Sequence, residues 1–250
     1  MKFILSPAKK MRADDGTLPS ALPCLLPETQ KLLSLLQSMS PQQLQTLWRC
    51  NDSIAALNLK RIHTMDLHRP AAAALYAYDG IQYTYMAPQV FTEQELDYVQ
   101  EHLRILSAFY GVLRPLDGVA LYRLEMQTKL AGEGFSNLYA FWGDHLAKAL
   151  GLAPNEPLID LASAEYSKAV LPHLSSRQPV VRCRFCQWSQ GKLVEKGVYA
   201  KMARGEMIRF LAETQAQSPL ELQHFNRQGY RFMPEYSTPN LYTFLQNSNQ

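Results

Sequence analysis

Several features that identify common classes of protein are missing from this 250-residue sequence. None of its apolar runs approaches the roughly 20 residues that a membrane-spanning helix needs. Met1 and Lys2 lead only to a short apolar run that Pro7 ends, which does not fit a secretory signal peptide. We therefore expect a cytoplasmic protein with no membrane partner.

Cysteine is also scarce, with four residues in the chain. Cys183 and Cys186 have the C-x-x-C spacing of many zinc sites, but they fall in residues 180–189, which we predict to be a strand. Side chains three positions apart on a strand point to opposite faces, which is poor geometry for sharing a metal ion. We expect buried thiols and no metal site.

Standard catalytic motifs are absent as well. The sequence contains no G-x-x-x-x-G-K-[ST], G-x-G-x-x-G, G-x-S-x-G or H-E-x-x-H motif. Its six histidines are scattered, and only His63 and His68 are close in sequence. We predict no cofactor and favour a protein that is not an enzyme, with an enzyme as the open alternative.

Positive charge is modest overall but concentrated in one segment. The net charge is +3, yet residues 168–209 contain nine Lys or Arg against two acids, which leaves 16 basic and 20 acidic residues elsewhere. Such asymmetry is typical of phosphate binding. A solvated basic face without a partner is the alternative.

Hydrophobic patterns and capping signals predict a mixed α/β protein with a central sheet and surrounding helices. We find no repeat or low-complexity run and only weak grounds for dividing the chain, and expect a single domain over residues 1–250. The predicted strands are 2–6, 104–107, 158–162, 231–236 and a hairpin of 180–189 with 192–199. The predicted helices are 28–37, 41–49, 52–65, 70–79, 92–102, 137–150, 165–171 and 200–215, with a short one after Ser218.

Three predicted strands end in serine, at Ser6, Ser107 and Ser163. If these strands are parallel neighbours, the serines line one edge of the sheet, where open α/β sheets bind ligands. Serine is also a common strand terminator and helix cap, which is the simpler alternative. The candidate pocket residues are Ser6, Lys9, Asn58, Ser107, Arg114, Glu125, Ser163, Glu165 and Tyr166.

Residues 103–126 form the densest stretch of the chain in functional side chains. We expect a short buried strand or helix end that leads into a stiff polar loop, because Gly111, Pro115 and Gly118 restrict or redirect the backbone. Arg114 and Arg123 on such a loop could hold an anion. A structural salt bridge between Arg123 and Glu125 is an equal alternative.

The same stretch carries a resemblance to a known family. Its motifs are ILS-x-x-YG-x-LRPLD (105–117) and YRLEM (122–126). Others run along the chain: ILSPAK (4–9), N-x-x-R (58–61), LY-x-FWGD (138–144), DLASAEY (160–166), AK-x-ARG (200–205) and FN-x-x-GY (225–230). Together, in this order, they resemble the YaaA family of bacterial peroxide-stress proteins.

That resemblance implies a cytoplasmic DNA-binding protein with an unusual α/β fold, a helix-hairpin-helix-like element and a positively charged cleft. It implies that the protein limits oxidative DNA damage and is linked to low intracellular iron, an effect that the scattered histidines lead us to expect to be indirect. The expected partner is double-stranded DNA, intact or distorted. The candidate DNA contacts are Lys9, Arg61, Ser107, Tyr110, Gly111, Arg114, Arg123, Lys201 and Arg204.

Two departures from the family pattern stand out. Ala108 replaces a glycine that is usual in the family, and the tail after Tyr236 is unlike the typical ending. Two other functions are kept as alternatives. One is an enzyme acting on a nucleotide or another anionic small molecule in the strand-end pocket, and the other is a regulatory protein that binds a small anionic ligand.

Overall fold

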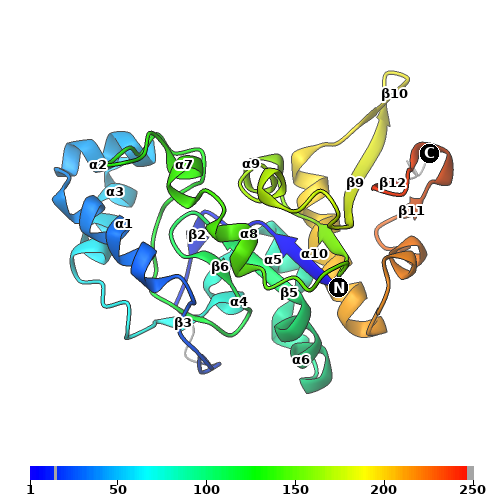
Figure 1. Ribbon diagram of the computed structural model, residues 1–250, viewed down its shortest axis with the longest axis horizontal. Helices are drawn as coiled ribbons and strands as arrows, with labels where there is room; N and C mark the ends of the chain where they lie inside the picture. The colour runs from blue at the N-terminus through cyan, green and yellow to red at the C-terminus, as the bar shows by residue number, and fades with distance from the viewer. Residues whose placement is uncertain (14–15, 247–250) are drawn as a thin grey trace.

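The computed structural model of this protein describes residues 1–13 and 16–246. An eight-stranded sheet lies at its centre, in the order β11-β12-β9-β8-β1-β5-β6, with β10 paired to β9 (Figure 1). Its strands are β1 (Lys2–Leu5), β5 (Leu103–Ser107), β6 (Gly111–Leu113), β8 (Leu158–Asp160), β9 (Val180–Ser189), β10 (Lys192–Val194), β11 (Tyr230–Phe232) and β12 (Leu241–Gln246).

The middle of this sheet is parallel. β5, β1, β8, β9 and β12 all run in one direction, whereas β6, β10 and β11 are antiparallel to their neighbours. β1 and β5 are buried along their whole length, as expected for strands covered on both faces. The predicted mixed α/β class is therefore confirmed.

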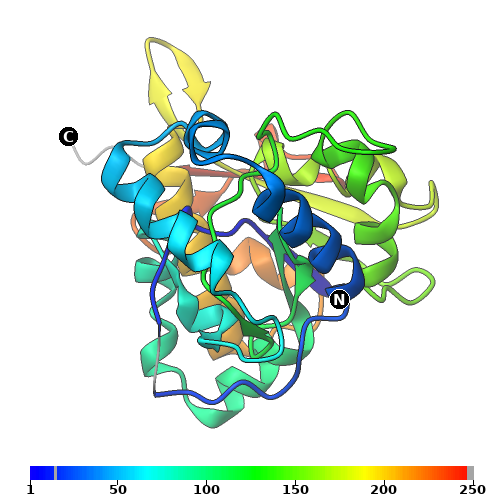
Figure 2. The same cartoon turned by 90° about the vertical axis from the view of Figure 1, so that its left-hand side faces the viewer.

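Helices surround the sheet. They are α1 (Leu26–Ser38), α2 (Pro41–Trp48), α3 (Asp52–His63), α4 (Ala74–Ala77), α5 (Ile81–Met86), α6 (Glu93–His102), α7 (Leu138–Trp142), α8 (His145–Ala149), α9 (Ala164–Ser167) and α10 (Gly197–Thr214). Ser40 and Thr92 form the capping boxes that start α2 and α6. Figure 1 shows α1, α2 and α3 together at one end of the molecule and β9–β12 at the other, and in Figure 2 these three helices face the viewer. No helix within residues 1–13 and 16–246 is long and apolar enough to cross a membrane.

α10 packs closely against α5. Gly205 permits this approach, because a Cβ atom there would overlap the carbonyl oxygen of Gln82 and lie 2.9 Å from the backbone nitrogen of Met86. The backbones of the two helices are therefore in direct contact. Since α10 carries Lys201 and Arg204, this contact fixes where both cations lie relative to α5.

The structure differs from the sequence prediction in three helical segments. Residues 70–79 were expected to be one helix, but they form β3 (Ala72–Ala73), the short α4 and β4 (Tyr78–Asp79). β3 pairs with β7 (Gly118–Val119), and β4 pairs with β2 (Lys10–Met11). These tertiary pairings override the helix propensity of alanine. The helix expected at 137–150 is divided by Gly143, whose φ is +47°. Residues 165–171 give only α9 and a 3-10 turn at Leu171–His173.

The C-terminal third also differs in its boundaries. The second strand of the predicted hairpin ends at Val194, and α10 begins at Gly197 rather than Ala200. The helix after Ser218 is a 3-10 helix, Pro219–His224. The segment predicted as strand 231–236 is a strand only over β11, followed by the 3-10 turn Pro234–Tyr236. The tail contributes β12, a strand that the sequence did not suggest.

Residues 105–113 form a β-hairpin, and the expected polar loop is wrong there. β5 pairs antiparallel with β6, with Ser107 opposite Gly111, and Ala108 lies in the turn between them. Gly111 has a φ of +78°, and a Cβ atom there would meet the side chain of Trp142 at 2.9 Å. The hairpin joins two strands and is covered by protein. It is therefore not the expected helix-hairpin-helix-like element.

Candidate functional site

Three strand ends meet at one edge of the sheet, as the sequence predicted. β1 pairs in parallel with both β5 and β8, so Ser6, Ser107 and Ser163 all follow strands that end on the same side. The backbone N–H of Ser163 donates to Ser6 Oγ at 2.8 Å, and Ser6 Oγ donates to Ser163 Oγ at 3.1 Å. Ser6 and Ser163 therefore join the ends of β1 and β8.

Ser107 is sealed inside the protein, so its predicted place in the pocket and on DNA is wrong. It is fully buried, and its Oγ accepts hydrogen bonds from the backbone N–H groups of Phe109 at 3.2 Å and Tyr110 at 2.8 Å. Its hydroxyl also lies 2.7 Å from the Tyr122 hydroxyl, which bonds that of Tyr78 at 2.8 Å. Burial raises the pKa of Tyr122 to about 12. These groups form an internal network.

Side chains of α5 hold the loop after β1 in place. The carbonyl oxygen of Ser6 accepts hydrogen bonds from Gln82 Nε2 at 2.9 Å and from the Tyr83 hydroxyl at 3.1 Å, both on α5. Gly80 brings the backbone so close that a Cβ atom there would lie 2.9 Å from the Cβ of Ala8. The Pro7–Lys9 segment is thereby fixed over the strand ends.

Two cavities adjoin this loop. The strand-end cavity, of about 320 Å³, is lined by Ser6, Pro7, Ala8, Lys9, Lys10, Asp79, Gly80, Ile81, Gln82, Leu124, Glu125, Ser163, Glu165, Tyr166, Lys201 and Arg204. The α2 cavity, of about 820 Å³, is lined by Lys9, Met39, Gln42, Gln43, Thr46, Leu47, Trp48, Arg49, Arg123, Glu125, Gln127, Thr128 and Lys129. Lys9 and Glu125 belong to both linings.

An ion pair stands between the two cavities. Lys9 Nζ lies 2.6 Å from Glu125 Oε2, and Arg123 Nη2 lies 3.7 Å from Glu125 Oε1. The predicted alternative, a salt bridge of Arg123 with Glu125, is thus observed. The Lys9 side chain is 65% exposed, so this pair adds little to stability. Lys9 can therefore exchange Glu125 for an incoming anion at small cost.

Glu165 is the most perturbed carboxyl group of the strand-end cavity. It accepts a hydrogen bond from the backbone N–H of Gln127 at 3.1 Å. Burial raises its pKa, and the negative charge of Glu125 acts in the same direction, whereas backbone hydrogen bonds and Lys9 oppose the shift. The adjacent Tyr166 is buried, and its pKa is raised well above its usual value for the same reason. A less readily ionised Glu165 weakens the repulsion of an anion here.

Arg204 and Lys201 reach the strand-end cavity from α10. Arg204 Nη2 lies 2.6 Å from Glu195 Oε1, and its Nε has no hydrogen-bond partner among the described residues. Lys201 is exposed, and within the described chain no acidic side chain forms an ion pair with it. Both cations therefore face the cavity rather than a separate helical surface.

Besides Ser107, four more predicted site residues lie away from the two cavities. Tyr110 is fully buried and Gly111 is covered, so their expected contact with DNA phosphates is wrong. Asn58 and Arg61 face the same way on α3, as predicted, with Arg61 Nη1 3.4 Å from Asn58 Oδ1. Asn58 is buried, and Arg61 bonds the carbonyl of Met11 at 3.5 Å. Neither lines the two cavities.

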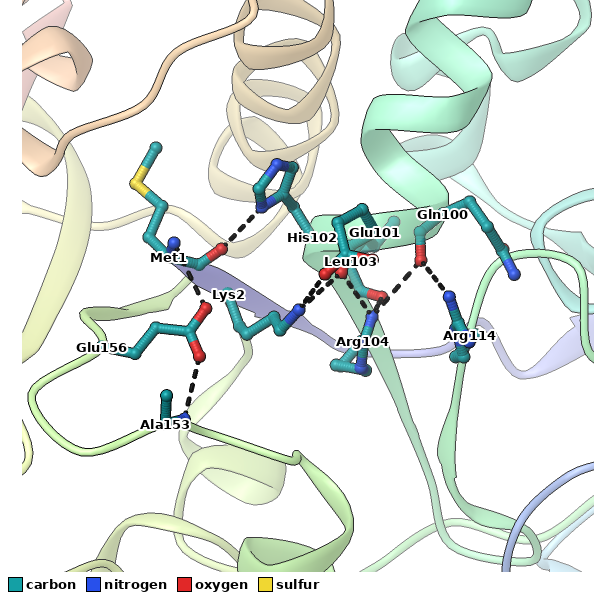
Figure 3. A network of polar contacts seen from close by, with 10 residues as sticks. All are labelled: Met1, Lys2, Gln100, Glu101, His102, Leu103, Arg104, Arg114, Ala153 and Glu156. Atoms are coloured by element: carbon teal, nitrogen blue, oxygen red, sulfur yellow. Dashed lines mark hydrogen bonds and ion pairs between the residues drawn. The ribbon is translucent and has the colours of Figure 1, made fainter.

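Arg114 lies at the opposite edge of the sheet (Figure 3). Because β6 runs antiparallel to β5, the chain returns to the start of β5, where Arg114 Nη2 bonds the Gln100 carbonyl at 3.5 Å. Arg104 bonds the Glu101 carbonyl at 3.0 Å in the same network. The placement of Arg114 in the strand-end pocket is therefore wrong.

Several cavity residues were not predicted. Lys10, Asp79 and Gly80 line the strand-end cavity, and Arg49 and Lys129 line the α2 cavity. Lys10 could have been predicted because it follows Lys9 in the sequence. Arg49, Asp79, Gly80 and Lys129 come from segments that are distant from Lys9 in the sequence. Part of the basic segment is neutralised, because Arg182 pairs with Asp160 at 3.3 Å and Arg209 with Glu213 at 2.8 Å. The segment is not one continuous basic patch.

Metal ligands do not converge in the described part of the chain, where no group of three or more His, Cys, Asp or Glu side chains could hold an ion. Cys183 and Cys186 are both buried and unpaired, as expected for structural thiols. Burial raises the pKa of both groups.

Comparison with known proteins finds relatives that match almost the whole chain. The chain is 46% identical over 245 residues to a UPF0246 protein of Agathobacter rectalis, covering 98% of each. It is 47% identical over 246 residues to one of Desulfitobacterium hafniense, again covering 98% of each, and 46% identical over 246 residues to one of Lactiplantibacillus plantarum, covering 98% and 99%. A family model described as "Peroxide stress protein YaaA" matches residues 1–236, and the chain belongs to this family.

Proposed function

We propose that this peroxide-stress protein binds DNA through a groove formed by the α2 cavity and the strand-end cavity. One observation carries the proposal: the two cavities share Lys9 and Glu125, so their basic residues follow one path. The basic residues of this path are Arg49, Arg123, Lys129, Lys9, Lys10, Lys201 and Arg204. The acidic residues on it are Asp79, Glu125 and Glu165.

Phosphate recognition fits this composition. Basic side chains along a groove bind the nucleic-acid backbone with little dependence on base sequence. Lys129 and Lys201 are exposed, and no ion pair with an acid involves either of them in the described residues. Arg49 shares both properties, so these three are the cations most available to phosphate, with Arg49 and Lys129 in the α2 cavity and Lys201 in the strand-end cavity. Intact or distorted duplex DNA is the proposed ligand, and limiting oxidative damage to it is the proposed outcome.

Binding of a labelled duplex across a salt series tests this proposal. We expect the affinity of the wild-type protein to fall as salt rises, and the Lys129→Ala/Lys201→Ala variant to bind more weakly, with a salt slope smaller by about 2. Lys31→Ala/Lys60→Ala is the matched control, because both lysines are exposed and neither lines these two cavities. Equal binding by the wild type and both variants would rule out the groove.

The link of the family to low iron is proposed to be indirect, following from action on DNA rather than from iron bound to this chain. Titration of the purified protein with ferrous iron under anaerobic conditions tests this point. Tight stoichiometric binding would contradict it.

A small anionic ligand in the strand-end cavity is the second candidate function. It is favoured by the concentration of Arg204, Lys201 and the raised-pKa Glu165 in about 320 Å³, a volume within the range of small-molecule sites. Thermal unfolding with a panel of nucleotides tests it. A rise in Tm that Lys201→Ala abolishes would favour an enzyme or a ligand-binding regulator.

A further inference from the structure

The β9–β10 hairpin projects from the body of the molecule in both overall views (Figures 1 and 2). β12 pairs with β9 only from Arg182 to Gln187, whereas β10 pairs with Gln187 to Ser189. Trp188 therefore lies beyond the end of β12, on a two-stranded arm.

Exposed aromatic side chains gather at this arm. Trp188 is 47% exposed and contacts Tyr236, 39% exposed, with ring centroids 6.1 Å apart and an angle of 85° between the rings. The other two tryptophans of the chain, Trp48 and Trp142, are 4% and 0% exposed. Exposed aromatic rings that gather on a projecting arm are a candidate surface for contact with a partner.

The charges around these rings are positive. Lys192 and Lys196 are exposed, and neither forms an ion pair with an acid in the described chain. Arg184 projects to the same face of β9 as Trp188 and bonds Thr243 Oγ1 at 3.2 Å. Glu195, the acid nearest in sequence, is already held by Arg204. Glu235, next to Tyr236, remains as one exposed acid.

The arm is continuous with the proposed groove. Arg204 lines the strand-end cavity and also binds Glu195, which immediately follows β10. A strand of nucleic acid that leaves the groove past Arg204 would therefore meet Lys196 at the base of the arm and then the aromatic rings, with Lys192 opposite Ser189 nearer the tip.

We propose that the β9–β10 arm binds single-stranded nucleic acid, with unpaired bases stacked on Trp188 and Tyr236 and phosphates on Lys192 and Lys196. This inference rests on the proposed DNA-binding function and names the form of DNA that it favours. Base faces are hidden inside an intact duplex, and they become available to aromatic rings only at gaps, ends and unpaired regions.

Tryptophan fluorescence tests this inference directly, because Trp188 is the exposed member of the three tryptophans. We expect oligothymidylate to quench the emission of the wild-type protein and to leave that of Trp188→Phe unchanged, while Trp188→Phe still binds the oligonucleotide. Trp188→Ala should bind oligothymidylate about 5- to 150-fold more weakly, the range for loss of one stacked base. Its affinity for an intact duplex should stay within about twofold.

The outcomes separate this inference from the groove proposal. Binding of oligothymidylate without quenching, or with unchanged affinity in Trp188→Ala, would contradict binding at the arm. It would leave the proposal for the groove unaffected. If the groove variant Lys129→Ala/Lys201→Ala binds duplex normally and oligothymidylate still quenches its fluorescence, binding at the arm is supported. The proposal that the groove binds DNA is then contradicted. A native mass that doubles in the wild type and not in Trp188→Ala, without oligonucleotide, would show that the rings cover a second copy of this chain and would overturn the inference.

Discussion

Asp117 carries a buried carboxyl group. Its side chain accepts a hydrogen bond from the backbone N–H of Arg114 at 2.8 Å, at the turn that follows β6. Burial raises its pKa from 3.8 to about 6, more than the hydrogen bond and the nearby arginines lower it. The folded protein therefore binds this proton more tightly than the unfolded chain does.

The stability of the protein should depend on this proton. As the pH rises from about 4 to 6, Asp117 must ionise while buried, so the free energy of unfolding falls over that range. In Asp117→Asn the amide oxygen can still accept the Arg114 bond, and this contribution disappears. Burial lowers the pKa of His102, so this group makes the free energy of unfolding rise with pH. It is present in both proteins. We therefore expect the difference in unfolding free energy between wild type and Asp117→Asn to shift against the wild type from pH 4 to 7, measured by urea denaturation. A difference independent of pH would contradict the buried ionisation.

Ser107 forms hydrogen bonds with several buried groups. Its Oγ accepts from two backbone N–H groups and bonds the Tyr122 hydroxyl. Ser107→Ala should lower the free energy of unfolding by about 1–3 kcal/mol, because these donors lose their acceptor in a fully buried site. Ser34→Ala is the control, since Ser34 is exposed on α1 and should change stability by less than about 0.5 kcal/mol. Equal losses for both variants would mean that the buried network is not needed.

At the scale of elements, the contact of α10 with α5 links stability to the site. α5 supplies Gln82 and Tyr83, which hold the Ser6 carbonyl, and α10 supplies Lys201 and Arg204. Gly205 lies where the two backbones touch. A change in this spacing would move both walls of the strand-end cavity.

Gly205→Ala should therefore reduce stability and, with it, the DNA affinity that we propose for the groove. Overpacking of this kind costs about 1–3 kcal/mol, and here the added methyl group meets backbone atoms that cannot rotate away. Gly197→Ala is a matched control on the same helix, because a Cβ atom there has nothing within 4 Å. Thermal unfolding of both variants is the measurement. An unchanged Tm for Gly205→Ala would show that the helices separate without cost.

At the scale of the whole molecule, the last strand completes the sheet. The family match ends at residue 236, whereas β12 covers Leu241–Gln246 and lies between β9 and β11. Phe244 is fully buried and stacks on Phe185 of β9, with ring centroids 5.2 Å apart. β12, which lies beyond the family match, is thus part of the core.

Truncation tests that conclusion. A chain that ends at Pro239 should lose cooperative unfolding or fail to accumulate in soluble form, because β9 and β11 lose their shared partner and Phe185 loses its cover. A chain that ends at Gln246 is the control and should unfold like the full-length protein. Circular dichroism during heating compares the two. A cooperative transition at the same temperature in the shorter chain would show that β12 is dispensable.

Several elements could be predicted because their signals are local. The capping residues Ser40 and Thr92 lie beside the backbone groups that they bind. The buried strands β1, β5 and β8 are short apolar runs with a serine at the strand end or within three residues after it. Their shared edge followed from the general rule for parallel sheets. Ser6, Lys9, Glu125, Ser163, Glu165, Tyr166, Lys201 and Arg204 are predicted residues that do line the strand-end cavity.

Tertiary structure decided what depends on partners distant in the chain. Ala72 and Ala73 pair with the strand at Gly118–Val119, so an alanine-rich segment with helix propensity became a strand, and the tail became β12 by the same kind of pairing. The antiparallel return of β6 carried Arg114 to the opposite edge of the sheet, and packing buried Ser107 and Tyr110. Sequence alone determined which segments are apolar and which residues cap helices, because both depend on near neighbours. Direction and burial depend on contacts across the whole fold, and for that reason only the tertiary structure decided which polar side chains face the groove.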